Sequence, residues 1–386
     1  MILIKNALIY TMEKDEIIKN GDILIENGKI IKIEKDIQTD SAKVIDVNGK
    51  MVLPGFIDAH CHLGMWEDAI GFEGADGNEA TNPITPHLRA IDAINPMDRT
   101  FEEAREAGVT LVATGPGSAN VIGGMFTAIK TYGDRIDDMI VKDPLAMKCA
   151  FGENPKNVYN DKKTSPSTRM AIAAELRNAI FTAKEYLSKK EAAGEDLSKM
   201  PDFDMKKEAL IPVLKKEIPL KAHAHRADDI LTAIRIAKEF DLNLTLEHCT
   251  EGHLIVDYLV KEGYPAIVGP SLSDRSKFEL KNLTFDTPGI LSKAGMKIAI
   301  MTDAPVIPLQ YLPMAAALSV KSGMDENEAL KAITINPAEI LGLEETVGSI
   351  KVGKDADIVI WHEHPFKLEA KPSVVMINGE IVYENN

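Results

Sequence analysis

Two pairs of histidines in this sequence have the spacing expected of metal ligands. His60 and His62 close the apolar stretch "LPGFIDAHCH", and His223 and His225 close "LKAHAH". Side chains two residues apart in a β-strand point to the same face, so each pair brings two imidazoles into one space. Imidazole nitrogens are common ligands of zinc and its neighbours in the transition series. One such pair alone is a modest signal, because histidine is also frequent in cores and on surfaces.

Two further residues strengthen the metal-site hypothesis, because both lie at the ends of strand-like segments. His248 ends "LTLEH", and Asp303 follows "IAIMT". In a parallel α/β barrel the carboxyl end of every strand opens onto one face, where residues far apart in the sequence converge. The sequence therefore predicts a site for a divalent metal, with Zn²⁺ as the first candidate.

The segments that would position these residues alternate in type along the chain. In residues 54–345, strand-like segments alternate with periodic helical ones, which favours a parallel α/β sheet, open or closed. Both chain ends, residues 1–53 and 346–386, instead show short alternating strands with "NG" at turns. We therefore expect a small β-domain built from both ends, with an α/β barrel inserted between them.

Residues 161–217 stand apart because they are rich in Lys and Glu. Charge-laced helices are usually exposed, so the segment is interpreted as a solvated helical pair that enlarges one barrel crossover. A lid or an oligomer contact is the alternative.

The overall composition limits the classes of partner. The chain has 386 residues and a net charge of -15, which argues against nucleic acid or an anionic membrane as partner. We find no apolar run long enough to span a bilayer and no signal peptide. Three cysteines make a disulfide framework improbable and favour a cytoplasmic location. All three adjoin candidate ligands, and strand alternation predicts that they turn away from the site as packing residues.

Several motifs together resemble the amidohydrolase superfamily, and most closely its imidazolonepropionase-like branch. They are "LPGFIDAHCH", "HAH", "EH", "TDAP" and "ITINPAEILGLEETVGSIKVGKDADIVIW", and they extend over essentially the whole chain. The resemblance implies a (β/α)8 TIM barrel with a small β-sandwich formed from both termini. It also implies a metal-dependent hydrolase of C–N bonds, in which Asp303 binds metal and carries a proton. The metal ligands implied by the family motifs are His60, His62, His223, His248 and Asp303.

The resemblance leaves the number of metal ions open. Binuclear members of the family bridge two ions with a carboxylated lysine or a glutamate from the third or fourth strand. "AMKCAFGENPK" offers Lys148 in mid-strand and Glu153 at the strand exit. Glu153 is the preferred bridge, because a glutamate needs no modification to act as a ligand, and Lys148 is the alternative. Glu153 could equally be a loop carboxylate that caps a turn.

Four more residues are candidates for catalysis or substrate binding. His225 could stabilise an oxyanion or orient a ligand, or it could be a buried histidine bonded to a neighbour. Arg226 occupies the position where deaminases of the superfamily usually carry glutamate, which argues against deamination. Arg226 and Arg275 could bind a substrate carboxylate, although each could instead form a structural ion pair. His87 could line the substrate site from the long loop after the first barrel strand.

The leading functional hypothesis is hydrolysis of an amide, peptide-like or N-acyl amino acid bond in a small molecule. A metal would lower the pKa of its water, and Asp303 would accept the water proton and return it to the leaving nitrogen. The alternatives are ring opening of a lactam or other cyclic amide, and a barrel that binds metal without catalysis. The sequence is also compatible with a homo-oligomer.

Overall fold

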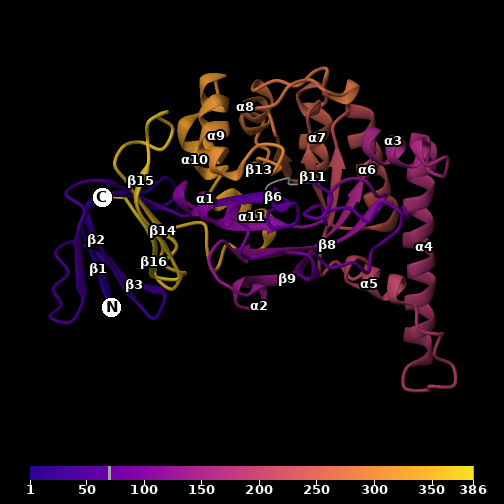
Figure 1. The fold of residues 1–386 in the computed structure, drawn as a ribbon, viewed down its shortest axis with the longest axis horizontal. Coiled ribbons are helices and arrows are strands. Elements are labelled where there is room, and N and C mark those ends of the chain that lie inside the picture. The colour runs from indigo at the N-terminus through magenta and orange to yellow at the C-terminus, as the bar shows by residue number, and fades with distance from the viewer. Residues whose placement is uncertain (68–70, 386) are drawn as a thin grey trace.

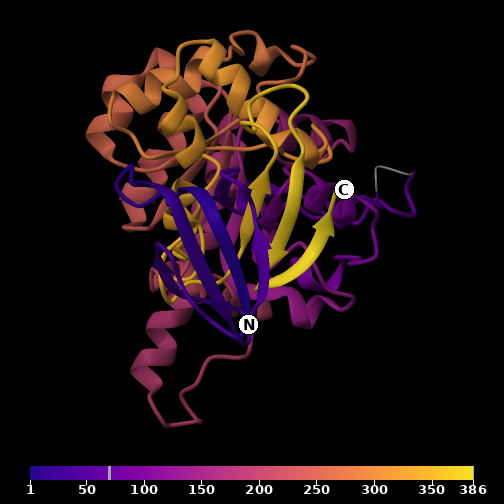
Figure 2. The same ribbon diagram turned by 90° about the vertical axis from the view of Figure 1, so that its left-hand side faces the viewer.

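The computed structural model describes residues 1–67 and 71–385, which form two sheets and the helices around them (Figure 1). One sheet has the order β16-β15-β14-β5-β1-β2-β3, with β4 paired to β1. Figure 2 shows its indigo N-terminal strands beside the yellow C-terminal ones. Its strands are β1 (Ile2–Tyr10), β2 (Ile17–Glu26), β3 (Lys29–Glu34), β4 (Lys43–Asp46), β5 (Met51–Pro54), β14 (Ile358–Trp361), β15 (Pro372–Ile377) and β16 (Glu380–Glu384).

This terminal sheet confirms that both chain ends build one β-domain. The ends meet where β14 pairs antiparallel with β5. Buried residues such as Ile4, Ile23 and Ile358 give the domain an apolar core of its own. The chain leaves this sheet at Gly55, where a β-carbon would lie 2.0 Å from Thr110 Oγ1, so a larger residue would clash with the barrel.

The second sheet is the barrel expected from the alternating pattern. Its eight strands follow the chain order from β6 to β13. They are β6 (Phe56–Cys61), β7 (Val109–Thr114), β8 (Ile122–Lys130), β9 (Ile140–Ala150), β10 (Leu220–Ala224), β11 (Leu244–His248), β12 (Ala266–Val268) and β13 (Ile298–Ile300).

One strand departs from the expected parallel arrangement. β8 runs antiparallel to both β7 and β9, whereas the other neighbouring pairs along the sheet are parallel. Residues 115–121, which join β7 to β8, are too few for the helical crossover that a parallel pair requires. The expectation of a wholly parallel barrel was therefore wrong for β8.

The barrel closes between β6 and β13 through a buried carboxylate. Asp58 Oδ2 accepts hydrogen bonds from the Thr302 backbone N–H at 2.9 Å and from its hydroxyl at 2.7 Å. The His62 N–H donates to the Ala304 carbonyl at 2.8 Å. Burial raises the pKa of Asp58 to about 7. These contacts bring the ends of the first and last barrel strands together, as a convergent site requires.

Helices surround the barrel, and two of them form the expected helical pair. Within residues 161–217 these are α4 and α5, in the crossover between β9 and β10, and α4 projects beyond the body of the molecule (Figure 1). No helix within the described residues combines the length and the apolar character needed to span a bilayer. The α-helices are α1 (Thr100–Glu106), α2 (Ile136–Met139), α3 (Glu153–Asp161), α4 (Arg169–Ala193), α5 (Met205–Leu214), α6 (Ala227–Phe240), α7 (Val256–Glu262), α8 (Asp286–Lys293), α9 (Leu312–Lys321), α10 (Glu326–Lys331) and α11 (Ile335–Leu341).

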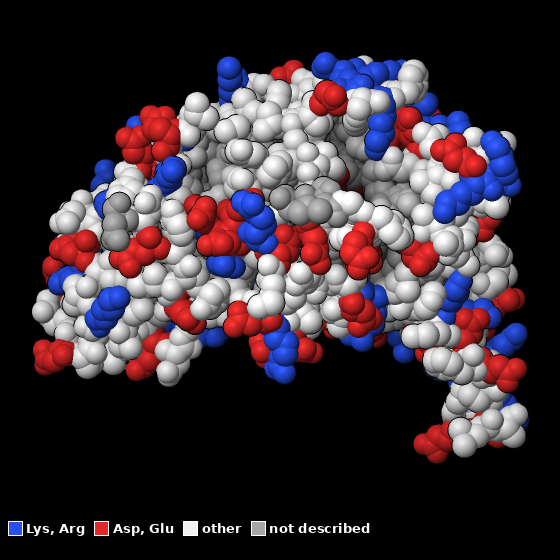
Figure 3. Space-filling model, viewed as in Figure 1, with Lys and Arg blue, Asp and Glu red and all other residues white. Residues whose placement is uncertain are grey.

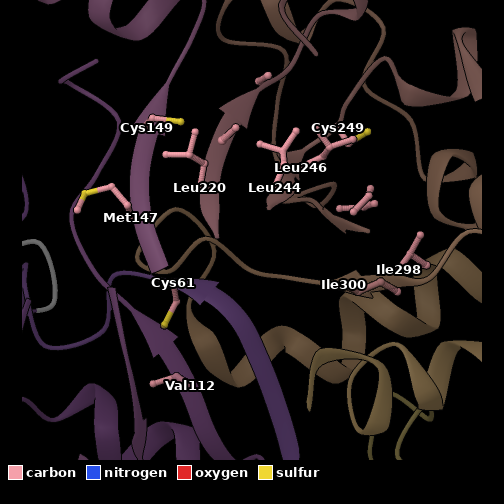
Figure 4. Packing of buried hydrophobic residues seen from close by; sticks show 14 of the residues in the cluster. Cys61, Val112, Met147, Cys149, Leu220, Leu244, Leu246, Cys249, Ile298 and Ile300 are labelled. Atoms are coloured by element: carbon pink, nitrogen blue, oxygen red, sulfur yellow. The ribbon is translucent and has the colours of Figure 1, made fainter. Parts of the chain in front are cut away.

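The three cysteines pack among apolar side chains, as predicted. Cys61, Cys149 and Cys249 are buried free thiols in the main hydrophobic cluster. Figure 4 shows them among neighbours such as Met147 and Leu246. Burial raises the pKa values of Cys149 and Cys249 to about 12, so both remain protonated at neutral pH. A protonated thiol is a poor metal ligand, which agrees with a packing role.

Candidate metal centre

The first group of candidate ligands joins the beginning and the end of the barrel. His60 lies in β6, His62 follows it, and Asp303 follows β13; one ligand atom from each lies within 4.8 Å of the others. Asp303 Oδ1 is 3.2 Å from His62 Nε2 and 3.5 Å from His60 Nε2. The backbone of Asp303 has φ of +55°, a left-handed conformation that costs free energy in a residue with a side chain.

The second group consists of His223, His225 and His248, from the ends of β10 and β11. The His248 ring centre lies 4.2 Å from that of His223 and 4.3 Å from that of His225. His248 also connects the two groups, since its ring centre is 5.5 Å from that of His60. All three side chains of the second group are buried. The structure thus brings together all six of these residues, His225 included, which the sequence had singled out.

Every histidine of the two groups is oriented by a contact to its Nδ1 atom. The partners are the Glu247 carboxylate at 2.7 Å for His60, the Gly115 carbonyl at 2.7 Å for His62, the Ser118 hydroxyl at 2.8 Å for His223, the Thr250 hydroxyl at 2.8 Å for His225 and the Gly269 carbonyl at 2.9 Å for His248. Such contacts fix the direction of each ring without occupying Nε2, the arrangement usual for histidines that bind metals.

The electrostatic environment keeps most of these imidazoles neutral. Burial lowers the pKa values of His60, His223 and His248 well below the usual value, and positively charged neighbours add to the effect. The pKa of His225 is lowered to about 3 for the same main reason. A histidine must be neutral to donate its lone pair to a metal, so these side chains are in a ligand-competent state at neutral pH.

A buried network of charges lies beneath the first group. Lys148 Nζ is 3.0 Å from His60 Nε2, while Glu247 accepts from His60 and pairs with Lys221 at 2.9 Å. Both lysine ammonium groups lie 5.4 Å from the centre of the Phe126 ring, which comes from the reversed strand β8 and lies 5.1 Å from the ring centre of His60. Burial lowers the pKa of Lys148 to about 8. Lys148 is therefore still mainly an ammonium at neutral pH, but it loses its proton more easily than an ordinary lysine.

The preference for Glu153 over Lys148 does not agree with this geometry. Glu153 begins α3, and its carboxylate is engaged outside both groups, where it accepts from the backbone N–H of Glu279 at 3.2 Å and from Asn157 Nδ2 at 3.4 Å. The long side chain of Lys148, by contrast, extends from mid-strand to the histidines. This contact favours Lys148 over Glu153 as the residue that reaches the ligand cluster.

The candidate substrate-binding residues belong to neither ligand group. Arg226 pairs with Asp228 at 2.8 Å, and Arg275 donates to the Leu283 carbonyl at 2.7 Å. His87 lies outside both groups, with its pKa lowered by burial and by Lys206. The loop from residue 63 to residue 95 includes residues 68–70, which lie outside the described residues. Part of this loop, with Trp66, lines a cavity of about 120 Å³ beside His62.

Sequence reasoning missed two buried carboxylates at the site. Glu247 precedes His248 in β11, and Glu279 lies in a short 3-10 helix (Phe278–Leu280) after β12. Glu279 Oε1 is 3.7 Å from His225 Nε2 and 4.0 Å from His223 Nε2. Glu247 adjoins a candidate ligand, which could have drawn attention to it. Glu279 belongs to no recognisable motif and is close to the histidines only in the folded chain.

The side chains of both groups suit a cation. Three of their buried atoms, His223 Nε2, His248 Nε2 and Asp303 Oδ1, have no hydrogen-bond partner, and neither has Oε1 of the neighbouring Glu279. Buried polar atoms normally have a partner, so a cluster of unpartnered nitrogen and oxygen acceptors needs a physical explanation. A divalent cation satisfies them all, because lone pairs of this kind are its ligands.

Comparisons with known proteins agree with this geometry. The model of the amidohydrolase family matches residues 51–382. An amidohydrolase from Thermotoga maritima, known as a crystal structure, is 46% identical with a TM-score of 0.97, and the match covers 100% of both chains. Amidohydrolase tasK from Hapsidospora irregularis is 30% identical over 87% of this chain, which spans only 37% of that protein. An imidazolonepropionase from Pseudomonas fluorescens is 25% identical over 80% of this chain and 79% of its own length.

Proposed function

The chain belongs to the amidohydrolase family, hydrolases of carbon–nitrogen bonds, and from this premise we propose that it uses a divalent cation to hydrolyse an amide-type bond in a small molecule. One observation carries the proposal. Histidines at the ends of β6, β10 and β11 are held at Nδ1, and together with Asp303 they form two buried groups of candidate ligands that His248 connects.

The cation would be held by the two groups described above, with zinc as the first candidate, since four or more His and Asp ligands suit it. When bound, a cation of this kind activates water and polarises a carbonyl group. The protein supplies the orientation of the ligands and a dry environment that strengthens their electrostatic effect.

Asp303 is the proposed proton carrier. It is the acidic member of the first group, and its side chain is 13% exposed, so it can meet a substrate. As the water oxygen adds to the carbonyl carbon, the water proton passes to the Asp303 carboxylate. The same proton then passes to the leaving nitrogen as the C–N bond breaks, and Asp303 returns to its starting state.

Lys148 is the proposed bridge between two ions. Its ammonium would first lose one proton, and the resulting amine would react with CO₂ to form a carbamate and release a second proton, so that a buried cationic group becomes an anionic ligand. Support comes from the 3.0 Å separation of Lys148 Nζ from His60 Nε2. Metal-free protein reloaded with Zn²⁺ in bicarbonate should bind two ions per chain. Reloading in CO₂-free buffer should give fewer, whereas equal loading in both buffers would contradict the bridge.

The proposed substrate is a peptide-like compound or an N-acyl amino acid. Arg226 supports a negatively charged substrate, because it directly follows His225 and its guanidinium would pair with a substrate carboxylate as it now pairs with Asp228. A cyclic amide is the second candidate, favoured by the similarity to imidazolonepropionases. Arg275 and His87 remain weaker candidates for substrate contact.

The test is metal analysis followed by a substrate panel. Protein purified without chelator should contain divalent metal, and it should hydrolyse dipeptides or N-acyl amino acids. Turnover of imidazolonepropionate or another lactam, with none of the linear amides, would select the second candidate. Metal-replete protein that hydrolyses none of them would support a barrel that binds metal without catalysis.

Location and assembly belong to the same proposal. A cytoplasmic enzyme without nucleic-acid or membrane partners is supported by the net charge of -15 and by the interspersed charges of the face in Figure 3. A homo-oligomer is supported by apolar side chains exposed on and near the projecting α4, where Phe181 is 54% exposed and Leu197 is 83% exposed. Light scattering of the purified protein measures the oligomeric state, and a monomer would contradict this part.

A further inference from the structure

Glu279 is a buried carboxylate with one oxygen bonded and the other unpartnered. Its side chain has no exposed surface, and Oε2 accepts a hydrogen bond from the Glu153 backbone N–H at 2.9 Å. Oε1 has no hydrogen-bond partner and lies 3.7 Å from His225 Nε2 and 4.0 Å from His223 Nε2. From this arrangement we propose that Glu279 is the anionic ligand of the cation bound by His223, His225 and His248.

The distances are close to those of two ligands on one ion. Ligand atoms about 2.1 Å from a tetrahedral zinc ion lie roughly 3.4 Å apart. In the first group, Asp303 Oδ1 is 3.2 Å and 3.5 Å from the two histidine nitrogens. Glu279 Oε1 needs to move by only about 0.3–0.6 Å to reach the same spacing. Each group of histidines would then have one carboxylate, Asp303 in the first and Glu279 in the second.

The charge balance favours the same assignment. A buried carboxylate without a partner costs several kcal/mol of stability unless a positive charge compensates it. The ammonium of Lys277 is 3.8 Å from Glu279 Oε1, but it bonds to Asn154 Oδ1 at 2.7 Å, and its side chain is partly exposed. A dication among three neutral histidines would pair with the Glu279 charge directly.

The surrounding backbone holds Glu279 in this orientation. Glu153 and Glu279 each accept the backbone N–H of the other, which fixes the turn after β9 against the 3-10 helix after β12. Gly152 makes this approach possible. A β-carbon at residue 152 would lie 2.8 Å from Glu279 Oε2, and the backbone there has φ of +82°. Glu153 is therefore a positioning residue, with Glu279 as the residue that reaches the histidines.

The inference rests on the proposed metal-dependent function. Measurements of Co²⁺ binding can refute the role of Glu279 without refuting that function. Metal-free protein is titrated with Co²⁺, and both the visible absorption bands and the affinity in competition with a chelator are recorded. Glu279→Gln should lower the affinity of one Co²⁺ site by about 100-fold or more and change its bands, since ligands matter at least as much as the groups that orient them. Glu363→Gln is the matched control, because it makes the same Glu-to-Gln change at an exposed residue that pairs with Lys367, and it should bind Co²⁺ as the wild type does.

Stability measurements keep the test decisive. Metal-free Glu279→Gln should be at least as stable as the metal-free wild type, because the substitution removes an uncompensated buried charge. If Glu279→Gln fails to fold, Glu279→Asp keeps the charge but withdraws the carboxylate by about 1.5 Å, one C–C bond, and should weaken the same site.

Two results would refute the ligand role of Glu279, and a third would refute the proposed metal-dependent function. Unchanged Co²⁺ affinity and bands in both Glu279 variants would refute the ligand role alone. Unchanged Co²⁺ binding with a raised KM for substrates that carry an ammonium group would assign Glu279 to substrate recognition instead. Failure of the wild type to bind Co²⁺ would refute the proposed metal-dependent function itself.

Discussion

Replacement of Glu247 by Gln tests how the protein prepares His60 to bind metal. Glu247 Oε2 lies 2.7 Å from His60 Nδ1 and 2.9 Å from Lys221 Nζ, and all three side chains are almost completely buried. Gln preserves the volume and one acceptor oxygen but removes the negative charge. His60 then loses the anion that orients it and raises its basicity, and Lys221 is left with less compensation in the core.

The size of both effects follows from these contacts. Loss of a carboxylate that orients a metal-binding histidine typically lowers metal affinity by about 10–100-fold, or roughly 1.4–2.7 kcal/mol. Removal of one partner from a buried ion pair destabilises a protein by about 3–5 kcal/mol. We therefore expect Glu247→Gln to weaken Zn²⁺ binding within this range and to lower the free energy of unfolding of the metal-free protein.

The assay separates folding from binding. Circular dichroism establishes that Glu247→Gln is folded, and competition with a chromophoric chelator then gives its Zn²⁺ affinity. Glu363→Gln is the control, because Glu363 pairs with Lys367 on the surface, where such pairs contribute about 0–1 kcal/mol. Wild-type Zn²⁺ affinity in a folded Glu247→Gln variant would refute the reasoning about His60.

Three further outcomes are expected. Asp303→Asn, loaded in excess Zn²⁺ to offset its weaker metal binding, should show a kcat lowered by about 10²–10⁴-fold, and turnover near the wild-type rate would exclude Asp303 as proton carrier. Phe126→Ala should lower the free energy of unfolding in urea by about 3–5 kcal/mol, because it removes the buried ring next to the two lysines and leaves a cavity. Burial would raise the pKa of Asp355, but Lys130 and Lys29 outweigh it and hold that pKa below the ordinary value of 3.8. The stabilising effect of the Asp355 charge is therefore complete above about pH 4–5 and is lost as the pH falls through the lowered pKa. We expect the free energy of unfolding of Asp355→Asn to be about 1–2 kcal/mol below that of the wild type at pH 7. Near pH 2 the two proteins should be almost equally stable.

Much of the site could be predicted because strand ends converge in a barrel. His60, His62, His223, His248 and Asp303 follow apolar segments in the sequence, and parallel strands bring such positions to one face. The terminal β-domain could also be predicted from the sequence, since alternating strands with "NG" turns mark both ends of the chain.

The features of the fold and the site that could not be predicted depend on long-range geometry, which local sequence patterns do not encode. The reversed direction of β8 follows from the length of the connection before it, which is visible only once the strand limits are known. The choice between Lys148 and Glu153 depends on the depth of the cluster in the barrel and on side-chain length. Glu279 reaches the histidines because a loop after β12 packs against the start of α3, a long-range contact without a sequence signature.

The central claim is that the two histidine groups bind a divalent cation. Anomalous X-ray diffraction at the zinc absorption edge tests it directly, on crystals of protein purified without chelator and supplied with Zn²⁺. We predict strong peaks between the Nε2 atoms of His60 and His62 and among those of His223, His225 and His248. Active, zinc-replete crystals without a peak at either position, or with peaks only elsewhere, would contradict the account.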